Sequence, residues 1–137
     1  MTGVLFDSDV LLDVLAQRQP FAILSTRALN RVTQSQVKGY VSGHSVTNIF
    51  YILRRQVGIE SARRLLLELM RHLQVAGVTD GVIRAALQSP IADFEDAVVS
   101  EAASFAEVNV IVTRNTSDFA ASIVPTVLPE EFLTMPL

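Results

Sequence analysis

The sequence predicts an α/β protein of three layers, with about six or seven helices covering both faces of a central, mostly parallel sheet of about four or five strands. Short apolar or β-branched runs suited to buried strands alternate with longer stretches in which apolar residues recur at helical spacing. The chain has 137 residues and 50% hydrophobic content, which is enough for a substantial core. No linker, repeat or low-complexity stretch divides it, so residues 1–137 are expected to form one domain.

The expected elements begin with a strand at Val4–Phe6, an apolar run too short for an exposed helix turn. A helix follows, because apolar residues recur at the spacing i, i+1, i+4 and i+5 from Val10 to Leu15. Pro20 ends this unit, and an apolar stripe predicts a second helix over residues 21–36. The second strand is expected at residues 39–42.

The middle of the chain is expected to form a pair of helices and a third strand. Hydroxyl residues near the start of residues 45–55 can cap a helix there, and a glycine separates it from a helix over residues 59–72. The third strand is expected at residues 74–77. Thr79 or Asp80 would cap the next helix, which runs to Gln88.

The last third of the chain repeats this alternation. A helix is expected from Asp93 to Ala106. Residues 108–113 form the clearest buried strand, because they are short, β-branched and followed by turn residues. A final strand is expected within residues 123–127, and Pro129 begins a short closing helix or turn. Strands that alternate with helices in this way favour a parallel sheet.

Composition excludes several classes of site. The chain has no cysteine, which excludes disulfides, thiolate metal sites and a cysteine nucleophile and leaves oxygen ligands as the expected metal chemistry. The net charge of −3 gives no basic signature, so a nucleic acid would be held by a local patch. No apolar run approaches the roughly 18 residues of a membrane span, and the N-terminus does not resemble a signal peptide. We therefore expect a cytoplasmic protein without membrane contact.

Acidic and amide side chains gather where the expected strands end. Two of these residues follow the first strand, two follow the fourth strand, and two lie on one face of a helix start: Asp7 and Asp9, Asn115 and Asp118, Asp93 and Asp96. The carboxyl ends of parallel strands share one edge of a sheet, so these groups can converge, and their repulsion would be relieved by protonation or by a cation. Mg²⁺ suits such oxygen ligands best, and Mn²⁺ prefers similar ones.

Most of these residues also have structural explanations. Asp93 is a good helix N-cap with an acid at the third helical position, and residues 115–118 are good turn formers. Asp7 is harder to explain, since a strand has no structural need for an acid directly after it. Asp13 lies further along the first helix, and we expect either a surface position or a supporting position behind the site.

Three stretches resemble the motifs of PIN-domain ribonucleases. Residues 6–13 (FDSDVLLD) resemble the opening motif, in which an Asp closes the first strand and an Asp or Asn follows two places later. Residues 93–97 (DFEDA) resemble the acidic helix start of the family, and residues 113–119 (TRNTSDF) resemble its final motif. The three stretches are in the order of the family, and the chain length is similar to that of VapC-type toxins of bacterial toxin–antitoxin pairs.

The resemblance implies a Mg²⁺- or Mn²⁺-dependent endoribonuclease that hydrolyses RNA phosphodiester bonds with a metal-activated water. It also implies a protein antitoxin as partner and a homodimer. The residues that it implies are Asp7, Asp96 and Asp118 as metal-binding acids, Asp93 and Asn115 as assisting residues, and Asp9 beside the first acid.

One position departs from the pattern of the family. Its remaining acid is a glutamate on the helix after the second strand, and the matching residue here is Asn48. An amide can coordinate through its carbonyl oxygen or orient a water, but it cannot serve as a general base. Asp93 can compensate in charge. The alternatives are a weak or inactive PIN-fold module that binds RNA or a protein partner and, more remotely, a phosphatase of small phosphates.

Basic residues offer further candidates. Ten of the eleven are arginines, which favours planar contacts with phosphates or carboxylates. Arg54, Arg55 and Arg114 are candidate contacts for RNA or a partner, and a solvated surface is the alternative. His44 and His72 have no ligand spacing between them and are expected to be ordinary surface or partly buried histidines.

Overall fold

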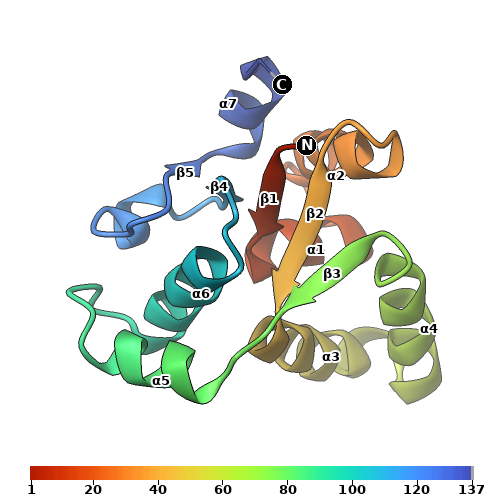
Figure 1. The fold of residues 1–137 in the computed structure, drawn as a ribbon. Coiled ribbons are helices and arrows are strands. Elements are labelled where there is room, and N and C mark those ends of the chain that lie inside the picture. The colour runs from red at the N-terminus through yellow and green to blue at the C-terminus, as the bar shows by residue number, and fades with distance from the viewer. Residues whose placement is uncertain (137) are drawn as a thin grey trace.

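The protein is represented by a computed structural model, which describes residues 1–136. In these residues, five parallel strands form one sheet in the order β3-β2-β1-β4-β5 (Figure 1). The strands are β1 (Gly3–Phe6), β2 (Lys38–Ser42), β3 (Leu73–Ala76), β4 (Val110–Val112) and β5 (Thr126–Val127). The helices are α1 (Ser8–Leu15), α2 (Ala22–Thr33), α3 (Gly43–Val57), α4 (Ile59–Leu69), α5 (Asp80–Leu87), α6 (Phe94–Phe105), the 3₁₀ turn η1 (Thr116–Phe119) and α7 (Pro129–Thr134).

Helices cover both faces of the sheet. Along β1, Val4 and Phe6 belong to one hydrophobic cluster and Leu5 to the other, because successive side chains of a strand point to opposite faces. The first cluster contains buried residues of α1, α2, α3, α4 and α7, and the second contains those of α5 and α6. Figure 1 shows α5 and α6 together, apart from α3 and α4. The predicted three-layer α/β/α fold is confirmed.

The order of the strands creates a crevice at their carboxyl ends. β1 lies in the middle of the sheet, with Leu5 in register with Tyr40 of β2 on one side and Ile111 of β4 on the other. The chain proceeds outward from β1 to β2 and β3, and then returns to β4 on the opposite side of β1. Ligands of open α/β sheets bind at such a reversal. Asp7 follows β1 directly, and Thr113 follows β4.

Several element boundaries differ by one to three residues from the prediction, and two of these differences have a clear structural reason. The second helix ends at Thr33 instead of residue 36, because Ser35 has a φ of 59°, which no helix can continue. The last strand begins only at Thr126, and Ile123 is exposed. Pro125 adds only its carbonyl oxygen to the sheet, which accepts a hydrogen bond from the amide of Ile111.

Gly58 separates α3 from α4 as predicted, with a φ of 85° that favours glycine. Among residues 1–136, no helix has the length and apolar character needed to cross a membrane.

Candidate active site

Asp7 lies at the point where β1 ends, between the sheet and α1. Its amide donates to the carbonyl of Val112, so the end of β1 is tied to the end of β4. Its carboxylate accepts hydrogen bonds from the Thr113 hydroxyl at 2.8 Å and from the Ser8 amide at 2.8 Å. The side chain is buried, and burial raises its pKa against the opposing effect of these hydrogen bonds. The charges of Asp93 and Glu95 raise it further.

Asp9, in the first turn of α1, fastens the turn that follows β4. Its Oδ2 accepts hydrogen bonds from the Arg114 amide at 3.0 Å and from the Asn115 side-chain amide at 3.4 Å. Burial, followed by the charge of Asp7, raises the pKa of Asp9 to about 6. Two segments of the chain that are about a hundred residues apart therefore share one acidic site.

The third part of the site is the start of α6. Asp93 is the N-cap, as predicted, and its Oδ1 accepts from the Asp96 amide at 3.0 Å. Asp96 is half-buried, and its pKa is raised to about 7, first by burial and then by the charges of Asp93, Asp7, Asp118 and Glu95. A carboxyl with such a pKa lies in surroundings whose burial and negative charge both disfavour its ionised form.

A cavity of about 310 Å³ lies between these three segments, and we call it the acidic cavity. Five residues predicted from the sequence line it: Asp7, Asp9, Asp96, Arg114 and Asn115. Asp93 and Asp118 line a neighbouring hollow instead. They act on the acidic cavity through their charge, since both raise the pKa of Asp96.

The other predicted residues lie on α3 and do not line this cavity. Asn48 lines an adjacent hollow of about 340 Å³ together with Ser8 and Glu95, both of which also line the acidic cavity. Arg54 and Arg55 belong to the last turn of α3, whereas the acidic cavity is lined by His44 from the first turn. Arg54 lies over the ring of Tyr51 at 4.9 Å.

Glu95 is a lining residue that the sequence analysis missed. It lies between Asp93 and Asp96 in the sequence, and the i, i+3 spacing of those two residues directed attention away from it. In the structure its Oε2 accepts a hydrogen bond from Asn48 Nδ2 at 3.3 Å. Asn48 on α3 thus forms a hydrogen bond with Glu95, which lines the cavity from the start of α6.

His44 and Arg18 were also missed as lining residues. His44 is half-buried, and its Nδ1 forms a hydrogen bond of 2.7 Å with the Ser42 hydroxyl. Burial lowers the pKa of His44. No sequence signal marked either residue, because each reaches the cavity from a loop or helix start whose direction is set only by the fold.

Asp13 occupies the supporting position, which was one of the two alternatives expected for it. Its side chain is fully buried. Its carboxylate accepts from Arg114 Nε at 2.8 Å, from Arg18 Nε at 3.1 Å and from the Ser25 hydroxyl at 3.1 Å. Both arginines line the acidic cavity, so the carboxylate of Asp13 fixes two arginine side chains beside the cluster of acids.

The donors of the acidic cavity fit a hard divalent cation. Four carboxylates line it, and the pKa values of three of them, Asp7, Asp9 and Asp96, are raised, which a cation would relieve. In the described part of the chain, no three acidic or histidine side chains converge closely enough to form a complete protein cage. Mg²⁺ is usually held by one or two carboxylates, with waters and phosphate oxygens completing its shell. Asp7, Asp96 and Glu95 are the residues that could hold it or its waters.

Comparison with known proteins agrees with this architecture. Residues 3–117 match the family model described as PIN domain. A toxin–antitoxin complex from Klebsiella pneumoniae has a TM-score of 0.71 at 18% identity, over 92% of this chain and 97% of that chain. For VapBC2 from Rickettsia felis, bound to a fragment of promoter DNA, the TM-score is 0.74 at 10% identity, over 93% and 98% of the two chains. For the sarcin–ricin loop cleaving toxin VapC20 from Mycobacterium tuberculosis, it is 0.70 at 15% identity, over 88% and 96%.

At these identities the solved structures show a common fold. No curated protein matches the sequence. The family model, in contrast, extends from the start of β1 into η1 and includes the first two motifs identified in the sequence in full and the third up to Ser117. The chain therefore belongs to the PIN domain family.

Proposed function

We propose that this protein is a metal-dependent endoribonuclease that acts as the toxin of a toxin–antitoxin pair. The observation that carries this proposal is the acidic cavity, where four carboxylates meet two fixed arginines at the reversal point of the sheet. A site that only stabilised the fold would not need acids whose pKa values are raised by burial and by one another. Two of the solved structures that share this fold are a toxin–antitoxin complex and a toxin that cleaves the sarcin–ricin loop, which supports a toxin.

The lining residues divide into two groups with complementary tasks. Asp7 and Asp96 would bind a Mg²⁺ or Mn²⁺ ion, with Glu95 on an ion-bound water. When bound, the ion supplies a water of lowered pKa and positive charge for the oxygens of the phosphodiester. Arg18 and Arg114 would bind the RNA backbone, because arginine presents planar donors that match a phosphate.

Three hydrogen bonds would keep this arrangement in place. The Thr113 hydroxyl fixes one oxygen of Asp7. Asp9 holds the Arg114 backbone and the Asn115 side chain, and thereby the turn after β4. We propose that Asp9 acts in this way and that Asp93 and Asp118 adjust the charge around Asp96. A metal-ion site works through such orienting contacts as much as through its ligands.

Glu95 would supply the negative charge that the neutral Asn48 lacks. The sequence alternative of an inactive binding module rested on the loss of one acid from α3. Asn48 Nδ2 donates to Glu95 Oε2 at 3.3 Å. A negative charge on α6 therefore lies within one hydrogen bond of position 48, where the family has its glutamate. We propose that Glu95 takes over the role of the absent glutamate, which favours the enzyme over the inactive module.

The partners that we propose are an RNA substrate, a protein antitoxin and a second copy of the chain. Exposed apolar side chains on α3 and α4, including Tyr51, Ile59 and Leu67, provide a surface on which an apolar segment of an antitoxin could pack. Co-purification with the product of a neighbouring short reading frame would test the antitoxin. Analytical ultracentrifugation of the isolated chain would test the homodimer.

The nuclease is tested by incubating partner-free protein with total and structured RNA in EDTA, Mg²⁺ or Mn²⁺. Cleavage is expected only with a metal ion, and Asp7→Asn should abolish it. Asp80→Asn is the matched control, because Asp80 also lies at a helix start but pairs with Arg84 on the surface of α5. If folded protein cleaves no RNA in any metal, or if Asp7→Asn cleaves as the parent does, the proposal is wrong.

A further inference from the structure

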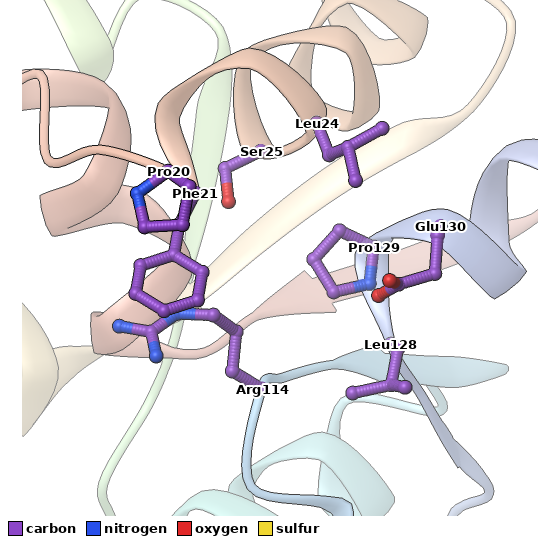
Figure 2. Close-up of a pocket in the computed structure, with 8 residues that line it drawn as sticks. All are labelled: Pro20, Phe21, Leu24, Ser25, Arg114, Leu128, Pro129 and Glu130. Carbon is purple, nitrogen blue, oxygen red and sulfur yellow. The ribbon is translucent and has the colours of Figure 1, made fainter.

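A second cavity, of about 450 Å³, lies beside the acidic cavity, and we call it the side cavity. Figure 2 shows its walls, which come from three parts of the chain. Phe21 and Leu24 lie at the start of α2, Leu128, Pro129 and Glu130 at the start of α7, and Arg114 after β4. The volume lies in the range of sites for small organic groups.

Arg114 lines both cavities, so the two adjoin at one side chain. Its guanidinium carbon lies 3.8 Å from the centre of the Phe21 ring. Two of its nitrogens donate to the buried carboxylate of Asp13, at 2.8 and 3.2 Å. Arg114 is therefore held rigidly between an acid and an aromatic ring, at the border between the two cavities.

The walls of the side cavity combine flat and apolar surfaces with the carboxylate of Glu130. Phe21 is 40% exposed, although it is a large aromatic residue at a helix start. Leu24, Leu128 and Pro129 add apolar surface. In Figure 2 the carboxylate of Glu130 is turned toward Pro129, on the side of the cavity. A flat ligand with N–H donors on its edge would match these walls.

We propose that the side cavity binds an unpaired guanine of the RNA substrate, next to the phosphate that enters the acidic cavity. This inference rests on the proposed ribonuclease function. Proteins read RNA mainly through unstacked bases, which stack on aromatic rings or arginine planes. Phe21 and Arg114 supply such surfaces, and the Glu130 carboxylate can accept from the adjacent N1–H and N2–H₂ groups that guanine alone carries on its pairing edge. Because the two cavities share Arg114, a base in one and a phosphate in the other would be neighbours on one strand.

Binding is measured separately from cleavage, in an Asp96→Asn background with Mg²⁺. The probes are fluorescent uridine octanucleotides, either unmodified or with one central guanosine, adenosine or cytidine, and the readout is anisotropy. We expect the guanosine probe to bind most tightly. Phe21→Leu, which keeps an apolar cover on Arg114 but removes the ring, should weaken its binding about tenfold or more, because stacking on an aromatic ring contributes about that much per base. Phe21→Tyr should retain the affinity.

Glu130→Gln should remove the preference for guanosine and leave binding of the uridine probe unchanged within about twofold. Phe105→Leu is the control for the loss of an exposed ring, since Phe105 is 56% exposed at the end of α6 and lines neither cavity. Thermal melting of every variant checks that it is folded.

The outcomes separate the two proposals. Equal binding of all four probes, or no effect of Phe21→Leu, overturns the guanine site even where the parent protein cleaves RNA. Preferential guanosine binding without metal-dependent cleavage by the parent supports the site and contradicts the nuclease. If Phe21→Leu weakens only the complex with a co-purified antitoxin, the cavity belongs to that partner and the guanine site is overturned.

Discussion

Moving the carboxylate of Glu95 on α6 to position 48 on α3 provides the sharpest test of whether the acidic cavity binds a metal ion. Glu95→Gln removes a negative charge from the cavity lining while keeping the shape of the side chain. We expect the affinity for Mn²⁺ to fall about 10- to 100-fold, as is usual when a residue that orients metal ligands is lost. The double variant Asn48→Glu/Glu95→Gln returns the charge to α3 and should recover most of the affinity.

The single variant Asn48→Glu has a different expected effect. The distance of 3.3 Å between Asn48 Nδ2 and Glu95 Oε2 implies that a glutamate at position 48 would place two carboxylates almost in contact. Because Glu95 is exposed, water screens the pair, and Coulomb's law in water at this distance gives a repulsion of about 1.3 kcal/mol. The metal-free variant should lose about this much unfolding free energy and bind Mn²⁺ at least as tightly as the parent.

Isothermal titration of Mn²⁺ into partner-free protein measures the affinities, and urea unfolding in EDTA measures the stabilities. Glu101→Gln, on the same helix but outside the lining, is the control and should leave both unchanged. The reasoning is refuted if Glu95→Gln binds Mn²⁺ as the parent does, or if the double variant binds no better than Glu95→Gln alone.

Three further predictions concern stability. The folded protein keeps a proton on Asp96, whose pKa is about 7, that the unfolded chain releases above 3.8, so this group makes the metal-free protein less stable as pH rises between those values. In urea unfolding, the free energy of unfolding of Asp96→Asn should rise relative to that of the parent from pH 5 to pH 8. A constant difference between the two would contradict the raised pKa. Mg²⁺ or Mn²⁺ should raise the melting temperature more at pH 8 than at pH 5.5, because protons compete with the ion; equal shifts would contradict carboxylate binding. Asp13→Asn should cost about 3 kcal/mol or more in urea unfolding, since it leaves Arg114 and Arg18 without their buried partner, whereas Asp80→Asn should cost under about 0.5 kcal/mol.

The sequence was sufficient to place the strands and the side chains that follow them directly. Asp7 and Asn115 were predicted from one rule, that polar residues at the carboxyl ends of parallel strands face a common crevice, and both line the acidic cavity. Asp96 was found through its spacing from Asp93. These predictions depend on local pattern and on the parallel order of strands, which the alternation of elements reveals.

The rest of the site depends on contacts that no local pattern contains. Asp118 was grouped with Asn115, but the tight turn of η1 places the two on different hollows. Glu95 reaches the cavity because α6 begins close to α3, and Asp13 is buried because Arg114 approaches from a hundred residues away. In each case the direction of approach of a second element decides the role of the residue.

The central position of β1 has a consequence for how this protein is made. β1 is synthesised before both of its neighbours, and one of them, β4, is not complete until Val112, with Arg114 and Asn115 following it. A nascent chain that ends before this point has the first acids of the site without the wall that faces them. The site can therefore be assembled only after Asn115 has been synthesised, about a hundred residues after Asp7, so shorter nascent chains lack the complete acidic cavity.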